Sequence, residues 1–252
     1  MNAGRQNRQA GHPWCETCPL RRQSAFMPKS DKDVAFISQL KIDHRRVAAG
    51  GEIIFPGQDD AELFTLFSGW AFRYKVMADG RRQILNFLLP GDLLGLQSSL
   101  LSIAQFGIEA LTDVEVCVFP RRRIWELFQN MPQLAYDLAW LGSREESLID
   151  ENLLSVGQRS AAERVASLVI SLYRRAEALG LVTDRSFVFP LTRQHLADAL
   201  GLSLVHASKT WSRLRRAGLF TQVNGRLVLL NPRLTERLAA KFDGDFVKRP
   251  IL

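Results

Sequence analysis

The segment LTRQHLADALGLSLVHASKTWSRLRRAGLF (191–220) constrains the fold of this chain more than any other part of the sequence. Thr192 can cap a first helix, and Gly201 ends that helix in a tight turn. A second amphipathic helix is predicted to follow over 203–216. Two helices joined by a short glycine-containing turn are typical of the helix-turn-helix arrangement.

The residues around this segment point to DNA. Asn224-Gly225 lies between two apolar runs and predicts a β-hairpin, as in the winged variant. The second helix suits the major groove, and its basic residues suit phosphates. The candidate DNA-binding residues are Arg193, Ser203, Val205, His206, Ser208, Lys209, Ser212 and Arg213. The alternative is a helical hairpin for protein contact, but turn, wing and basic bias together favour DNA.

Composition sets the broad class of the protein. The 252 residues are 46% hydrophobic and carry a net charge of +7, which permits binding to a polyanion. No apolar run approaches the ~18 residues of a membrane span, and the first residues lack the apolar core of a signal peptide. We therefore expect a cytoplasmic protein with no membrane contact. No grouping of nucleophile and base, and no glycine-rich phosphate loop, emerges, so we expect no catalytic residues and no enzyme activity.

The texture of the sequence changes along the chain and predicts an α+β architecture. Residues 1–30 are rich in Gly, Pro, Arg and Gln and predict a flexible arm. Residues 31–131 begin with a short helix and continue as apolar runs separated by turn residues, which predicts a β-roll or barrel. A long helix is predicted over 132–158, and the winged domain over 159–252.

The long helix is a candidate for pairing two subunits, because its apolar residues recur in steps of three and four. The candidate dimer-interface residues are Leu138, Leu141, Ile149 and Leu153. Four acidic residues lie close to the possible seams: Glu145, Glu146, Asp150 and Glu151. Like charges that meet across a two-fold axis oppose pairing, so we expect a marginal homodimer.

Five segments together resemble the CRP/FNR superfamily of bacterial transcription regulators. They are GEIIFPGQDD, LFSGWAFRY, ILNFLLPGDLLG, SAAERVASLV and LTRQHLADALGLS, in the order of the family. The resemblance covers nearly the whole chain. It implies an N-terminal cyclic-nucleotide-binding-like β-roll, a long dimerisation helix and a C-terminal winged helix-turn-helix. It also implies a homodimer on a palindromic operator in double-stranded DNA and contact with RNA polymerase, with activation favoured over repression.

The effector site departs from the cyclic-nucleotide branch of this family. In that branch an Arg-Ser pair after a Pro-Gly-Asp turn holds the cyclic phosphate. The matching segment here, LLGLQSSLLSIAQFGIEAL, contains no arginine. A buried phosphate needs a positive partner or several donors, so we do not expect cyclic AMP as the effector.

The three cysteines resemble the pattern of the oxygen-sensing branch, which holds a [4Fe–4S] cluster. Cys15 and Cys18 match its N-terminal CxxC, and Cys117 matches its distant ligand. A cubane takes four ligands, and the further cysteine of the branch is absent near Ser24. His12 is the candidate replacement, and Ser24 or an exogenous ligand are alternatives. A zinc site, a thiol redox pair, or no cofactor with Cys117 as core filling remain open alternatives.

The recognition helix also departs from the best-known branches. The resemblance places Val205 where those branches have a glutamate, and Lys209 where they have an arginine. Valine can make apolar contact with a thymine methyl but cannot accept a hydrogen bond from cytosine. We expect His206 and Ser208 to read base edges, and Arg193 to contact phosphate.

The hairpin ADGRRQ matches a loop that contacts polymerase through acidic residues in the oxygen-sensing branch. Arg81 and Arg82 stand there instead. The polymerase contact is therefore expected to differ.

Overall fold

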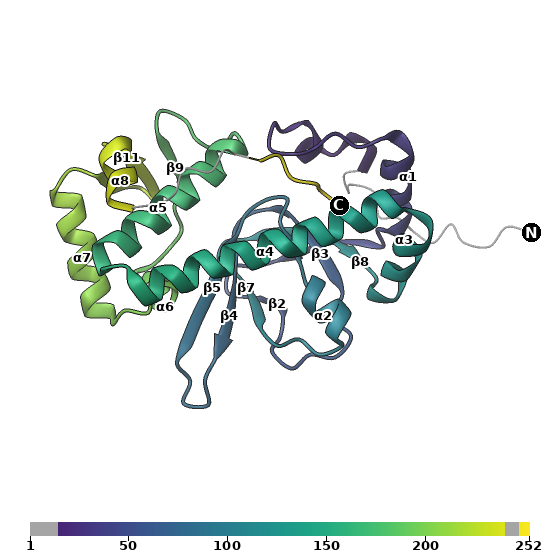
Figure 1. Ribbon diagram of the computed structural model, residues 1–252, viewed down its shortest axis with the longest axis horizontal. Coiled ribbons are helices and arrows are strands. Elements are labelled where there is room, and N and C mark those ends of the chain that lie inside the picture. The colour runs from purple at the N-terminus through teal and green to yellow at the C-terminus, as the bar shows by residue number, and fades with distance from the viewer. Residues whose placement is uncertain (1–14, 240–246) are drawn as a thin grey trace, which may run out of the picture.

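The computed structural model of the chain describes residues 15–239 and 247–252. A β-roll is crossed by the long helix α4 (Pro132–Gln158), and the winged domain lies at the far end of that helix (Figure 1). This is the α+β architecture that the sequence predicts. Within the described residues, no helix is long and apolar enough to cross a membrane.

Two four-stranded antiparallel sheets form the β-roll. The first has the order β1-β8-β3-β6 and the second β2-β7-β4-β5. The strands of the first sheet are β1 (Asp43–Val47), β8 (Val114–Phe119), β3 (Leu63–Ser68) and β6 (Leu93–Leu94). Those of the second are β2 (Glu52–Ile54), β7 (Gly107–Ala110), β4 (Ala71–Val76) and β5 (Arg82–Leu88). In β8 the buried Val114, Val116 and Val118 alternate with half-buried residues, so one face of the strand lines the core.

Short helices surround the roll. Helix α1 (Asp31–Leu40) starts in a capping box between Ser30 and Asp33. Helix α2 (Leu96–Leu101) follows β6, and a 3-10 turn (Arg121–Arg123) leads into α3 (Ile124–Asn130). Two further 3-10 helices, Cys15–Thr17 and Pro19–Arg22, precede α1.

Residues 15–30, which we expected to belong to a flexible arm, pack against the rest of the protein instead. Leu20, Ala25 and Phe26 are buried in the main core. The sequence pattern was misleading because these three apolar residues are scattered among polar ones without a helical or strand period. His12 lies outside the described residues.

Helix α4 corrects the predicted dimer seam. Leu138 and Leu141 are buried, and Leu138 packs into the cluster that joins α1, α3 and the roll. They are therefore enclosed by their own chain and are not at its surface, where the predicted seam would need them. Ile149 is half-buried and Leu153 is 70% exposed. A stripe with steps of three and four has the same spacing whether it meets a sheet or a second helix, so sequence alone could not separate the two.

The winged domain has the predicted order of elements. Helix α5 (Ala161–Ala178) opens in a capping box, and α6 (Arg193–Leu200) and α7 (Leu204–Arg216) form the helix-turn-helix. A sheet of order β10-β11-β9 supplies the wing, and α8 (Pro232–Ala239) follows. Its strands are β9 (Ser186–Val188), β10 (Phe220–Val223) and β11 (Arg226–Leu229). The expected turn at Asn224-Gly225 joins β10 to β11, with φ of 49° and 73°.

Candidate DNA-binding surface and cysteine pocket

Helix α7 separates the residues that anchor it from those that it displays. Ala207, Thr210, Trp211 and Leu214 are buried, at the spacing of one helical face. On the opposite face the predicted DNA-binding residues Val205, His206, Lys209 and Arg213 are exposed, and Ser208 and Ser212 are half-buried beside them. The anchoring is aromatic, because Trp211 stacks on Phe189 and contacts Phe220 at a centroid distance of 4.5 Å.

The start of α7 is capped by a residue that we expected to contact DNA. The Ser203 hydroxyl accepts a hydrogen bond from the His206 backbone N–H at 3.2 Å. Ser203 therefore orients the first turn, and the exposed side chains of Val205 and His206 project from that turn.

Arg193 lies at the start of α6 and packs against α7. Its guanidinium is 4.3 Å from the centroid of the Trp211 ring. Burial, and then the neighbouring Arg215, lower the pKa of Arg193 from its usual value. The stacking holds the half-buried side chain beside the displayed face of α7.

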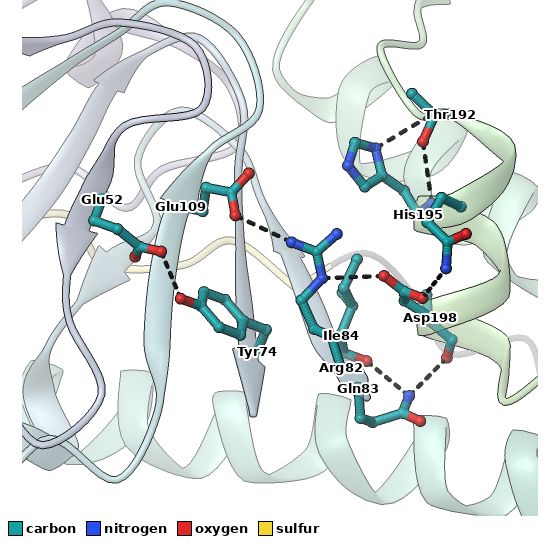
Figure 2. Close-up of polar contacts among 11 residues, drawn as sticks. Glu52, Tyr74, Arg82, Gln83, Ile84, Glu109, Thr192, His195 and Asp198 are labelled. Carbon is teal, nitrogen blue, oxygen red and sulfur yellow. Dashed lines mark hydrogen bonds and ion pairs between the residues drawn. The ribbon is translucent and has the colours of Figure 1, made fainter. Parts of the chain in front are cut away.

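Helix α6 is attached to the β-roll by a polar cluster (Figure 2). Arg82 Nε lies 3.0 Å from Asp198 Oδ2 on α6, and Arg82 Nη1 lies 3.1 Å from Glu109 Oε2 on β7. Gln83 Nε2 donates to the carbonyl of Ala199 at 3.2 Å. The first helix of the helix-turn-helix is therefore held against strand β5.

His195 makes contacts in the winged domain and with the β-roll. Its backbone N–H donates to Thr192 Oγ1 at 3.1 Å, and its Nδ1 accepts from the Thr192 backbone N–H at 3.2 Å, which closes a capping box. Its ring centroid lies 5.4 Å from that of Phe72 on β4. Burial, and then the nearby Arg82, lower the pKa of His195, so its ring is neutral where it caps α6.

The cluster also separates the two arginines of the β4–β5 hairpin, while the expected change in the polymerase contact stays a prediction. Arg82 makes ion pairs inside the protein and is not free at the hairpin tip for polymerase. Arg81 remains exposed and pairs with Asp79 at 2.8 Å. The two positions differ because Arg81 lies in the hairpin turn, whereas Arg82 is the first residue of β5.

Cys15, Cys18 and Cys117 line one small cavity of about 30 Å³. Cys15 begins the first 3-10 helix, Cys18 precedes the second, and Cys117 comes from β8, about a hundred residues later. Lys41 and Phe67 also line it. All three thiols are half-buried.

The pocket keeps two of its thiols protonated at neutral pH. Burial raises the pKa of Cys117 to about 11, and burial also raises the pKa of Cys15, although Lys41 opposes both shifts. His44 borders Cys117, with 3.8 Å between Nδ1 and Sγ, and its Nε2 lies 2.9 Å from Glu115 Oε2. These contacts orient the imidazole beside the thiol.

The pocket gathers soft sulfur donors without bringing them to ligating distance. Within residues 15–239 and 247–252, no three Cys, His, Asp or Glu side chains lie close enough together to hold a metal ion. Ser24, one of the considered ligands, is exposed and donates to the Ala178 carbonyl at 3.5 Å. His12, the candidate fourth ligand, lies outside the described residues. The donor types suit an iron–sulfur cluster or zinc, but the thiols would have to move together to bind either.

Sequence reasoning missed a buried carboxylate at the centre of the molecule. Asp92, in the Pro-Gly-Asp turn, pairs with Arg249, with Arg175 of α5 at 2.5 Å and with Arg144 of α4 at 3.8 Å. Burial alone would raise the pKa of Asp92, but these three arginines lower it to about 2. A turn aspartate has an ordinary local role, so nothing in the sequence near Asp92 signals these distant partners.

Comparison with known proteins covers both halves of the chain. Residues 44–131 match the cyclic nucleotide-binding domain, and residues 163–238 match the Crp-like helix-turn-helix domain. The nitrogen fixation regulation protein FixK of Bradyrhizobium diazoefficiens is 33% identical over 91% of this chain and 95% of its own length. The transcriptional activator protein FnrL of Cereibacter sphaeroides is 31% identical over 91% of this chain and 94% of its own. The structure of FixK2 from Bradyrhizobium japonicum has a TM-score of 0.72, with 27% identity, over 80% of this chain and 98% of that one.

Proposed function

The chain belongs to the CRP/FNR family of DNA-binding transcription regulators, and on that premise we propose that it is an activator, acting in the cytoplasm, whose DNA binding responds to oxygen or redox state. The observation that carries the sensing role is the convergence of its three cysteines on one pocket. Packing against the core is the competing explanation for their position, and the iron and sulfide assay below separates the two. The relative FnrL is a transcriptional activator by name, which favours activation, and contact with RNA polymerase is part of this proposal.

The displayed face of α7 supports duplex DNA as the partner. On this proposal His206 and Ser208 read base edges, and Lys209 and Arg213 contact phosphates. Binding to duplex DNA should weaken steeply as salt rises, because neutralised phosphates release counterions. Affinity that is insensitive to salt would argue for an adaptor that binds protein instead.

We propose that the protein acts as a homodimer on a palindromic operator, and that the outward face of α4 forms the interface. This outward stripe consists of Tyr136, Ala139, Ser143, Glu146, Asp150 and Leu153, all exposed. Two of the four acidic residues first considered are already neutralised. Glu145 pairs with Arg73 at 2.9 Å, and Glu151 with Arg159 at 2.7 Å.

Glu146 and Asp150 are therefore the carboxylates that would oppose pairing across a two-fold axis. Replacing both with alanine should tighten dimerisation, measured by sedimentation over a range of concentrations. A dimer that is equally tight in the parent and the variant would remove this repulsion from the mechanism.

A [4Fe–4S] cluster is the group that we propose for the cysteine pocket, with Cys15, Cys18 and Cys117 as three of its ligands. Such a cluster would supply an oxygen-labile centre. The half-buried thiols and the apolar lining from Phe67 and Ile37 would shield it from solvent. Cyclic AMP is not part of this proposal, because the segment after the Pro-Gly-Asp turn lacks an arginine.

Purification without oxygen tests the cluster directly. We expect broad visible absorbance, with iron and sulfide in equal amounts, and loss of both in Cys117→Ala. The matched control is Ser147→Ala, at an exposed residue of α4 outside the pocket lining, which should keep both. Zinc alone would make the pocket a structural site and would sink the sensing proposal.

A second candidate is a regulator of the same type without a metal, controlled by another effector or by thiol oxidation. It is favoured by the absence of a preassembled ligand set among the described residues. Colourless, metal-free protein that still binds DNA would select this candidate over the first.

A further inference from the structure

The final segment of the sequence returns from the winged domain to the N-terminal region. In Figure 1 this yellow segment passes from the side of α5 and β9 toward the purple arm. Phe26 and Arg249 form a parallel β-bridge. The Met27 N–H donates to the Arg249 carbonyl at 2.8 Å, and the Arg249 N–H donates to the Ala25 carbonyl at 3.0 Å. We call Arg249–Leu252 the strap.

The strap ends at the cysteine pocket. Ile251 is buried, and both Ile251 and Leu252 line the cavity beside the three thiols. Thr65 Oγ1 donates to the Leu252 carbonyl at 2.9 Å. Thr65 is the cross-strand neighbour of Cys117 in the pairing of β3 with β8, so the strap is anchored directly beside that thiol.

The cavity is so small that the position of the strap determines what can enter it. About 30 Å³ leaves room for about two water molecules. A larger group can enter only if part of the lining moves. The walls from α1, β3 and β8 belong to regular elements whose backbone hydrogen bonds hold them in place. The strap is held by the bridge to Phe26, the Thr65 hydrogen bond and the Arg249 side chain, without the repeated backbone hydrogen bonds of a helix or a long strand, so we infer that it can be displaced as a unit.

The other end of the strap is tied to the buried carboxylate at the centre of the molecule. Arg249 pairs with Asp92, donates to the Pro90 carbonyl at 2.9 Å and stacks on Phe26 at 4.9 Å. Arg175 of α5 shares the same carboxylate. A displaced strap would therefore change the charge balance at a residue that also holds the winged domain.

We propose that the strap is a gate of the cysteine pocket: closure by Ile251 and Leu252 and occupation of the pocket by any group larger than about two waters exclude each other. The regulatory meaning of this gate rests on the sensing role proposed above. The exclusion itself concerns only the strap and the thiols. Because Arg249 of the strap and Arg175 of α5 share the Asp92 carboxylate, opening the pocket changes the contacts of a residue that also holds the winged domain.

Thiol labelling tests the gate in one direction. The rate of Cys117 alkylation by N-ethylmaleimide is followed by peptide mass spectrometry in the parent and in the double variant Ile251→Ala/Leu252→Ala. We expect labelling to be at least tenfold faster in the variant, because removal of the two side chains that line the cavity opens a path for the reagent to the half-buried thiol.

Two controls separate gating from general loosening. Lys248→Ala alters an exposed residue next to the strap and should leave the rate unchanged. Val165→Ala creates a core cavity in α5, away from the pocket lining, and should leave Cys117 protected. Unchanged labelling in the double variant, or equal acceleration in Val165→Ala, would overturn the gate.

Hydrogen exchange tests the opposite direction. After Cys117 has been labelled with a bulky maleimide, the Met27 and Arg249 amides should exchange at least tenfold faster, because the strap has left. Unchanged exchange at both amides would overturn the proposal. Neither measurement depends on a metal, so protein that fails the iron and sulfide assay still tests the strap.

Discussion

Helix α7 and the cysteine pocket use their functional side chains in opposite ways. Helix α7 holds its candidate residues within 13 consecutive positions and displays them to solvent. The pocket draws on the arm, α1, two strands of the roll and the strap, and it keeps its thiols half-buried. The first region needs a surface that fits a large, charged partner. The second needs an enclosed space in which a small chemical change can alter the packing.

The difference predicts how each region responds to mutation. A displayed side chain can be removed with little effect on the fold, so its loss should appear in DNA binding. A buried side chain is surrounded by groups that depend on it, so its loss should appear first in stability. Charged residues give the clearest test, because α7 displays them to solvent whereas the cluster around Asp92, to which the strap is tied, encloses them.

The largest effect is expected at the buried centre. Asp92→Asn leaves Arg175 and Arg249 buried without their counter-charge and should lower the free energy of unfolding by about 3–5 kcal/mol. Urea denaturation at neutral pH measures this loss. A loss below about 1 kcal/mol, the size of an exposed pair, would erase the contrast with α7.

The stability of the protein at low pH should depend on the same carboxylate, that of Asp92. Its pKa falls from the usual 3.8 to about 2 on folding, so its stabilising contribution is complete above pH 3.8 and is lost as the pH falls toward 2. The parent should lose stability over this window, and Asp92→Asn should lose less. Identical acid profiles for the two proteins would contradict the assignment.

The next effect is expected in base recognition. His206→Ala should reduce discrimination at one operator position by about 1–3 kcal/mol and leave stability unchanged. Selection of bound sequences from a pool of random duplexes, carried out with the variant and with the parent, measures this change in preference. Arg193→Ala should instead weaken binding to all sequences to the same extent. An unchanged sequence preference in His206→Ala would contradict base reading by His206.

A smaller effect is expected at the start of α6. Thr192→Ala removes the acceptor for the His195 N–H and should cost about 1 kcal/mol of stability. Loss of the cap should also speed amide exchange in α6, because the first turn of the helix opens more often and its contact with β5 is weakened. The same substitution at Ser203, which caps α7 away from the roll, should cost a similar amount without altering exchange in α6. Equal exchange in both variants would mean that the contact with β5 does not depend on the α6 cap.

The smallest effect on stability is expected at Lys209. This exposed residue should change the free energy of unfolding by less than about 0.5 kcal/mol when replaced by alanine. The same substitution should reduce the slope of log affinity against log salt by about 1 if the ammonium contacts a phosphate. A loss of stability comparable to that of Asp92→Asn would break the comparison between displayed and buried charge.

The elements that could be predicted from the sequence are those whose signals are local. The winged helix-turn-helix could be predicted because Thr192, Gly201 and Asn224-Gly225 act on their immediate neighbours through caps and turns. The same holds for the capping box of α5 and for the alternating valines of β8. In each case the physical cause lies within a few residues of the signal.

Contacts between groups that are distant in the sequence became known only from the tertiary structure. The burial of Leu138 and Leu141 against the roll, the attachment of Arg82 to α6 and the ordered arm all depend on surfaces brought together by the whole chain. So do the arginines around Asp92 and the strap beside Cys117. Spacing shows which residues share a face of a helix or strand, but which surface that face meets depends on the packing of the entire fold.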